Sequence, residues 1–175
     1  MRYHTAFLFR LITAWVVVAF RGVYAPIVTT FSAYASYIPL SILFGARLSG
    51  NVISLSGKSI EYVEACSAIG AYVFLALLIL LTGGIEFRKG VKLFAYGSLL
   101  ILLANIIRID VLAYLLANNN IDMFLTLHLF IWKIISGIYV ALVWIFLVKK
   151  YDIKGIPLVD DFKYFLRKSF LKKGK

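Results

Sequence analysis

Three side chains in this sequence have the chemistry to cleave an amide through a thioester, although they lie far apart along the chain. Cys66 is the only cysteine, Arg108 lies near the end of an apolar run, and His128 is one of two histidines. A cysteine thiolate attacks a carbonyl carbon, an arginine stabilises the oxyanion that forms, and a histidine protonates the leaving amine. This set of residue types indicates nucleophilic acyl transfer, provided that the fold brings the three together.

The elements that position these residues are predicted to be membrane helices. The chain has 175 residues, of which 62% are hydrophobic, and its mean hydropathy is +0.92. A soluble domain is about 45–50% apolar, and several runs here approach or exceed the roughly 18 apolar residues that span a bilayer. We therefore expect an all-α polytopic membrane protein, a compact helix bundle of about four to five membrane helices.

Positive charge predicts how this bundle is oriented. Nine of the nineteen lysines and arginines lie in residues 149–175, and others cluster in the segment Arg88–Lys92. Cytoplasmic loops are rich in lysine and arginine, so both regions are expected inside the cell. The prediction is a multi-pass plasma-membrane protein with a transmembrane bundle in residues 1–150. Residues 151–175 then form a basic amphipathic tail on the anionic inner leaflet, and no nucleic-acid partner is expected.

Topology then places the three residues at one level. The second half of the chain is expected to cross the membrane at Ala65–Thr82, at Val91–Arg108 with an extension to Ala117, and at Met123–Val148. Cys66 opens the first crossing on the external side, where the helix dipole favours a thiolate. Arg108 closes the second crossing on that side, and His128 lies about 9 Å into the third. The candidate site is therefore predicted to face outside.

The N-terminal third is expected to cross the membrane once, over Thr5–Ala25, with a break near Pro26 and a second helix over Thr29–Gly45 in the outer leaflet. Two short crossings that begin outside are the alternative, which basic residues near the N-terminus disfavour. Arg10 and Arg21 are expected to snorkel toward opposite faces. No small-residue cleavage site follows the first apolar stretch, so no cleavable signal peptide is expected.

Between this third and Cys66, the sequence predicts a small external β-hairpin. Apolar residues alternate with polar ones at Ile53, Leu55, Ile60 and Tyr62, around a turn at Ser56–Lys58. Such alternation around a glycine-containing turn is typical of two short antiparallel strands. A lone hairpin is marginal without packing, so we expect it to lie against the bundle.

The segments around the three residues resemble the signature blocks of the exosortase/archaeosortase family. VEACSAIGAYVFLALL contains Cys66, NIIRI contains Arg108, and LHLFIWKIISG contains His128. With the preceding GNVISLSGKSIEYV, the resemblance covers residues 50–137. The family usually has a glycine two residues after its cysteine, where this chain has Ala68, and a small alanine is expected to permit the same close approach of helices.

The resemblance implies a membrane cysteine transpeptidase or protease whose catalytic residues are Cys66, Arg108 and His128. Its substrates would be exported membrane proteins with a C-terminal sorting signal, which consists of a short motif, one transmembrane helix and a basic end. The processed protein would pass to an acceptor, such as a lipid, or to water. No metal and no organic cofactor is implied.

Four further residues lie close enough in sequence to support such a site. Asn105 is one turn before Arg108 on the same helix face and is placed to orient it. Glu64 and Ser67 flank the cysteine, and Glu64 is either a substrate contact or a solvated loop charge. Lys133, in the last predicted crossing, either lines the cavity or snorkels to the interface.

Two readings from other classes stay open at this stage. A non-catalytic membrane subunit or small transporter would use Arg108, His128 and Lys133 to line a polar path, and it would tolerate the loss of Cys66. A structural scaffold would need none of these residues. A thiol oxidoreductase is disfavoured, because the chain has no second cysteine to resolve a disulfide.

Overall fold

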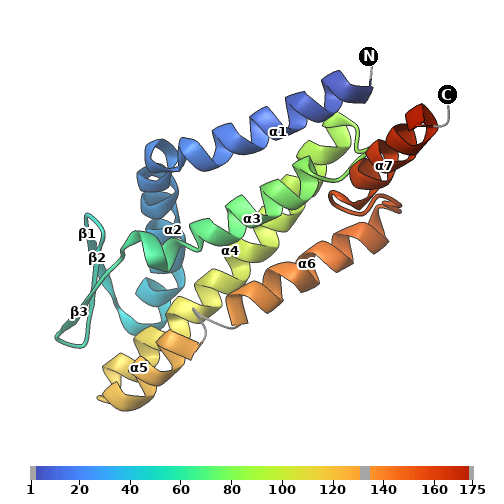
Figure 1. Cartoon of the computed structure of the whole chain (residues 1–175). Coiled ribbons are helices and arrows are strands. Elements are labelled where there is room, and N and C mark those ends of the chain that lie inside the picture. The colour runs from blue at the N-terminus through green and yellow to red at the C-terminus, as the bar shows by residue number, and fades with distance from the viewer. Residues whose placement is uncertain (1–2, 131–134, 174–175) are drawn as a thin grey trace.

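The structure, a computed structural model, describes residues 3–130 and 135–173. Figure 1 shows a bundle of helices with a small sheet at one end and both termini at the other. The elements are α1 (Tyr3–Ala19), α2 (Arg21–Phe44), β1 (Arg47–Ser49), β2 (Val52–Leu55), β3 (Lys58–Glu61), the 3-10 helix η1 (Glu64–Ser67), α3 (Ile69–Leu80), α4 (Phe87–Ala117), α5 (Ile121–Phe130), α6 (Ser136–Lys150) and α7 (Val159–Lys173). The fold is thus mostly helical with a small sheet, as the sequence predicts.

Two helices of the described part are long and apolar enough to cross a membrane. α2 has 24 residues and α4 has 31 residues, and α1 and α3 contain shorter apolar stretches. At about 1.5 Å per residue, α4 is longer than the roughly 30 Å hydrocarbon core of a bilayer. Large apolar side chains point away from the bundle on both long helices, among them Ile42 (78% exposed) and Ile107 (64% exposed). Such surfaces suit contact with lipid.

The half of the bundle away from the sheet is held together by an apolar cluster from α3, α4 and α6. Its buried members are Leu75, Ile79, Leu93, Ile101, Val140, Val143, Trp144 and Leu147. Gly97 of α4 lies at the centre of this contact, where an added Cβ would be 2.5 Å from Leu75 Cδ2 and 3.0 Å from Leu147 Cδ1. A small residue at this position lets three helices approach closely, as is common between membrane helices.

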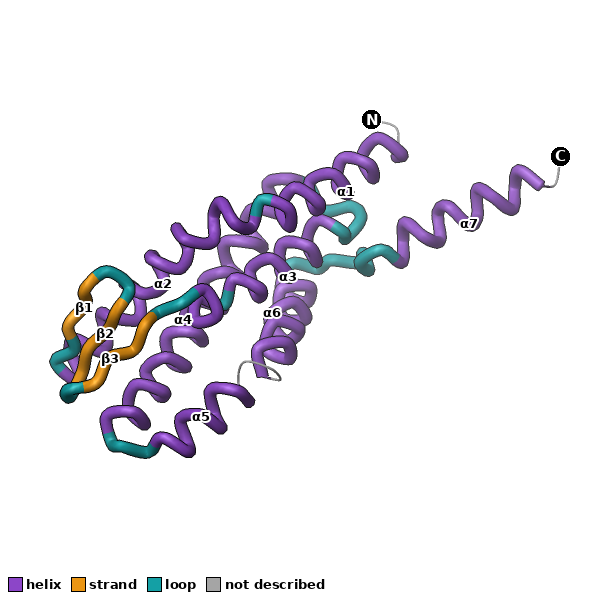
Figure 2. Tube along the Cα trace, turned by 60° about the vertical axis from the view of Figure 1, so that its left-hand side comes forward, coloured by secondary structure: helices purple, strands orange, loops and turns teal. Residues whose placement is uncertain are grey.

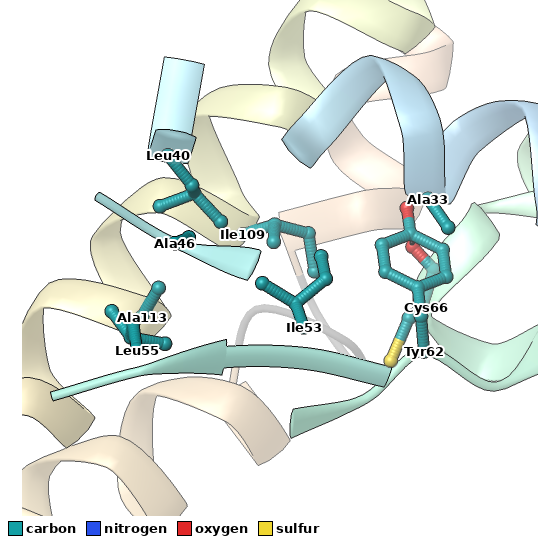
Figure 3. Packing of buried hydrophobic residues seen from close by; sticks show 9 residues of the cluster. All are labelled: Ala33, Leu40, Ala46, Ile53, Leu55, Tyr62, Cys66, Ile109 and Ala113. Atoms are coloured by element: carbon teal, nitrogen blue, oxygen red, sulfur yellow. Dashed lines mark hydrogen bonds between the residues drawn. The ribbon is translucent and has the colours of Figure 1, made fainter. Parts of the chain in front are cut away.

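The predicted hairpin is confirmed, and it is extended by a third strand. β2 and β3 pair antiparallel with Ile53 opposite Ile60, and β1 pairs antiparallel with the other edge of β2. β1 was not predicted from the sequence, because it has only three residues, two of them exposed. Ile53 and Leu55 pack with residues of α2 and α4, including Leu40 and Ile109 (Figure 3).

The break in the N-terminal third lies earlier than predicted. α1 ends at Ala19, and α2 then continues through Pro26 and Pro39 to Gly45, whose φ of 62° caps it. A proline removes one hydrogen bond and crowds the carbonyl four residues before it, so its distortion falls in the preceding turn. The predicted helices Thr5–Ala25 and Thr29–Gly45 are corrected accordingly.

The C-terminal helix α7 lies at the end of the molecule opposite the sheet (Figure 2). Arg10 Nη2 and Asp161 Oδ1 form an ion pair at 2.6 Å, in which the Asp161 side chain is 3% exposed. The rings of Phe7 and Phe165 meet edge to face at 5.1 Å. α7 is therefore attached to α1 by a buried charge pair and an aromatic contact.

The predicted crossing Met123–Val148 covers most of α5 and of α6. Residues 131–134, between these two helices, lie outside the described residues.

Candidate active site

Cys66 lies in a single turn of 3-10 helix between the sheet and α3. The chain is extended at Val63, with φ and ψ of −95° and 171°, and then winds once through η1. The Cys66 N–H donates to the carbonyl oxygen of Val63 at 2.8 Å. The predicted helix over Ala65–Thr82 is therefore wrong at its start, since α3 begins only at Ile69. The thiol precedes α3 instead of belonging to it.

Ala68 separates η1 from α3 because its backbone is left-handed, with φ and ψ of 56° and 27°. This conformation costs an L-residue other than glycine about 1 kcal/mol or more. A glycine at this position, which the family resemblance leads one to expect, would adopt this backbone conformation without that cost. The turn also leaves the Cys66 carbonyl outside α3, free to accept hydrogen bonds from side chains.

Three buried side chains donate to the carbonyl oxygen of Cys66. Tyr62 Oη donates at 3.0 Å, Asn105 Nδ2 at 2.9 Å and Arg108 Nη2 at 2.8 Å. Asn105 Nδ2 also donates to Tyr62 Oη at 2.9 Å, so these two side chains hold each other as well as the carbonyl. Because Asn105 and Arg108 both belong to α4, the cysteine is tied to the second half of that helix. We call these three donors and their acceptor the Cys66 carbonyl cluster.

Tyr62 is the most enclosed member of this cluster. Its side chain is 1% exposed and lies beside Cys66 (Figure 3). Burial raises the pKa of the Tyr62 phenol above its ordinary range, because the charged form is disfavoured away from water. The hydroxyl is therefore protonated near neutral pH and available to donate.

α2 supports η1 from the other side with small side chains. The buried residues of α2 are Ala25, Thr29, Ser32, Ala33, Ser36 and Leu40. Thr29 Oγ1 donates to Ser67 Oγ at 3.3 Å, and Ser67 Oγ donates to the carbonyl oxygen of Glu64 at 2.7 Å. The Glu64 carboxylate forms an exposed ion pair with Arg21 at the start of α2. η1 is thus fixed by α2 through its first and last residues and by α4 through Cys66.

Arg108 is a cation that the fold keeps almost completely from solvent, at 8% exposure. Its Nη2 donates to the carbonyl oxygen of Cys66, whereas its Nε is buried and has no hydrogen-bond partner among the described residues. A buried charged donor without a partner is costly, and such groups are concentrated at functional sites. Arg108 therefore holds a donor in reserve next to the cysteine.

His128 lies on α5, the helix that follows α4, and its ring is partly buried. It stacks on Phe124 with ring centroids 5.9 Å apart and an interplanar angle of 11°. α5 packs against α4, the helix that carries Arg108. The structure thus joins Cys66 and Arg108 by a hydrogen bond and places His128 on the helix next to α4. Within the described residues, no group of three or more His, Cys, Asp or Glu side chains is arranged to hold a metal ion.

The sequence of the chain is similar to those of known proteins. Residues 2–148 match the family model described as transmembrane exosortase. The chain belongs to the transmembrane exosortase family. The chain is also similar to a protein named probable archaeosortase E from Methanocaldococcus jannaschii, with 38% identity over 86 residues. That alignment covers 47% of the chain and only 44% of the relative's length. No solved structure gives a significant match.

Family membership confirms the predicted family and the membrane character of the chain. No hydrogen bond among the described residues joins Asn105 to Arg108; both residues donate to the Cys66 carbonyl instead. The sequence predicts Tyr62 only as part of the apolar face of the hairpin. Alternation of apolar and polar residues treats a tyrosine like a phenylalanine, so a role for the Tyr62 hydroxyl was not predicted. Lys133 lies outside the described residues.

Proposed function

We propose that this exosortase is a membrane-embedded cysteine transpeptidase or protease that cleaves the C-terminal sorting signal of exported proteins. Cys66 is the nucleophile, Arg108 stabilises the oxyanion, and His128 is the general acid. One observation carries the proposal: Arg108 is buried against the cysteine residue, bound to its carbonyl at 2.8 Å, with a further guanidinium donor unused. Family membership supports a sortase-like reaction at the level of the class.

The reaction proceeds in two acyl-transfer steps. The Cys66 thiolate attacks the scissile carbonyl carbon, and the oxyanion that forms is stabilised by the Arg108 guanidinium. The C–N bond breaks as the leaving amine takes a proton from His128, which leaves the acyl group on sulfur as a thioester. An acceptor nucleophile, or water, then attacks the thioester, gives up its proton to His128, and releases the thiolate.

The position of the site within the bundle suits a membrane-anchored substrate. Cys66 lies near the sheet, whereas α7 and the basic segment Arg88–Lys92 lie at the opposite end (Figure 1). If the basic end is cytoplasmic, the cysteine faces outside in the plasma membrane. A single substrate helix can then pack on the exposed apolar side of the bundle, with its external motif beside the cysteine and its basic end at the inner leaflet.

The test uses this exosortase and a candidate membrane protein that carries a short motif, a transmembrane helix and a basic C-terminus, in one membrane preparation. The mass of the candidate is followed with wild type and with Cys66→Ala. The expected result is C-terminal truncation that disappears in the alanine variant. Ser98→Ala is the matched control and should process the candidate normally. It also removes a buried polar side-chain atom, but from α4 instead of η1. Equal processing by wild type and Cys66→Ala would remove Cys66 as nucleophile and favour a non-catalytic subunit or transporter.

A further inference from the structure

The Cys66 carbonyl cluster contains more donors than its acceptor needs. A backbone carbonyl oxygen has two lone pairs, whereas this one receives hydrogen bonds from Tyr62, Asn105 and Arg108. The three donor–acceptor distances lie between 2.8 and 3.0 Å, so no donor is clearly excluded. One donor can therefore leave while the buried carbonyl oxygen keeps two hydrogen bonds, so no buried acceptor is left unsatisfied.

Arg108 is the donor whose departure has a chemical use. Its guanidinium carries a fixed positive charge, and an oxyanion that forms beside the Cys66 sulfur attracts it more strongly than a neutral carbonyl does. Tyr62 and Asn105 have no such alternative, since they are linked to each other at 2.9 Å and buried at 1% and 4% exposure. They remain on the carbonyl when Arg108 shifts.

We propose that Tyr62 and Asn105 are positioning residues of the acylation step: they keep the Cys66 carbonyl bound, so that Arg108 can transfer a donor to the substrate oxyanion. This inference rests on the proposed function, because it assumes that Cys66 is acylated. Without Asn105, the carbonyl would lose one donor, and the Tyr62 hydroxyl would lose the amide that donates to it. Arg108 would then be held on the carbonyl in the transition state, and acylation would slow.

Two small reagents separate this role from a merely structural one. p-Nitrophenyl acetate acylates a thiolate through a tetrahedral oxyanion: a C–S bond forms, the ester C–O bond breaks, and p-nitrophenolate leaves. Iodoacetamide alkylates the same thiolate without an oxyanion, because a C–S bond forms as the C–I bond breaks and iodide leaves. Both rates are measured on the full chain in detergent, and the rate of Cys66→Ala is subtracted as background.

We expect Asn105→Leu to lower the acylation rate by about tenfold or more, and Tyr62→Phe to lower it by a smaller factor. Both variants should keep their alkylation rate within about twofold of wild type, since neither residue is used in a reaction that forms no oxyanion. Tyr139→Phe is the matched control. It removes another tyrosine hydroxyl that donates to a backbone carbonyl, that of Leu100 at 2.9 Å, and should change neither rate.

Two results would overturn the inference. Acylation at the wild-type rate in both variants would show that the two residues do not assist Arg108. A fall of acylation and alkylation by the same factor would show that they only hold the cysteine in place. Tyr62→Phe, which removes a single oxygen atom, keeps the test decisive if Asn105→Leu does not fold. A wild type that is acylated no faster than Cys66→Ala would contradict the proposed nucleophile itself.

Discussion

The Nη2 atom of Arg108 donates a hydrogen bond of 2.8 Å to the carbonyl oxygen of Cys66, across 42 residues of sequence. The contact exists because α3 and α4 lie side by side and are joined by a short turn (Figure 1), which brings the start of α3 level with the second half of α4. A cation in a membrane protein is costly without a partner. Here its partner is the backbone of the candidate nucleophile, so the packing of two helices also sets the geometry of the site.

The left-handed backbone of Ala68 predicts that a glycine is better at this position. Ala68→Gly should raise the free energy of unfolding by about 1 kcal/mol, because it removes the steric cost of the left-handed conformation. Ala71→Gly should lower the free energy of unfolding by about 1 kcal/mol, because glycine is a poorer helix former than alanine. Ala71 is in the first turn of α3 and packs on the apolar cluster of α3, α4 and α6. Thermal unfolding in detergent compares the two variants, and equal destabilisation by both would contradict the backbone explanation.

Close packing around Gly97 predicts that glycine is preferred at that position too, here for a steric reason. Gly97→Ala should destabilise the bundle by about 1–3 kcal/mol, because its Cβ would overlap Leu75 Cδ2 at 2.5 Å. Gly70→Ala is the control, since nothing lies within 4 Å of an added Cβ there and the helix gains a better helix former. We expect Gly70→Ala to have the highest melting temperature, wild type an intermediate one and Gly97→Ala the lowest. A Gly97→Ala variant with the melting temperature of wild type would show that α3, α4 and α6 approach one another less closely than in the structure.

The buried pair of Arg10 and Asp161 predicts that the tail helix detaches when its charge is removed. Breaking a buried ion pair costs about 3 kcal/mol, so Asp161→Asn should make trypsin cleavage after the exposed Lys163 and Arg167 at least about tenfold faster. Asp152→Asn removes a charge from the exposed linker before α7 and should leave the cleavage rate unchanged. Equal rates in all three proteins would mean that α7 is held by other contacts.

The ion pair of Arg21 and Glu64 predicts only a small contribution of Glu64 to substrate binding. Both side chains are about half exposed, at 52% and 47%, and such pairs contribute no more than about 1 kcal/mol. Glu64→Gln should therefore leave KM for a processed substrate within about twofold of wild type, as should the control Glu61→Gln, which changes an exposed residue of β3. A large rise of KM confined to Glu64→Gln would instead assign this carboxylate to substrate recognition.

Patterns that depend on one element at a time could be predicted from the sequence. The helical class, the extent of α4 to Ala117 and the β2–β3 hairpin follow from apolar runs and alternation. The proximity of Cys66 and Arg108 follows from the predicted topology. Two consecutive crossings run in opposite directions, so the start of the first, with Cys66, lies level with the end of the second, with Arg108. The family resemblance rested on the same segments and is confirmed by the match over residues 2–148.

Features that depend on a single backbone angle or on a distant partner could not be predicted. The left-handed conformation of Ala68 removes Cys66 from α3, and nothing in an apolar run marks that position. Asn105 was expected to contact Arg108, one helical turn away, but its rotamer joins Tyr62 and the cysteine carbonyl instead. Arg10 and Asp161 meet across 151 residues, and no local pattern relates them.

The most direct test of the account is to trap the acyl-enzyme during processing of a signal-bearing membrane protein. The reaction is quenched with acid, and the exosortase is digested and analysed by mass spectrometry, with and without neutral hydroxylamine. The account predicts an acyl adduct on the peptide that contains Cys66, which hydroxylamine removes as it does other thioesters, and which Cys66→Ala lacks. Truncated substrate without an adduct on that peptide, or with an adduct on another residue, would contradict it.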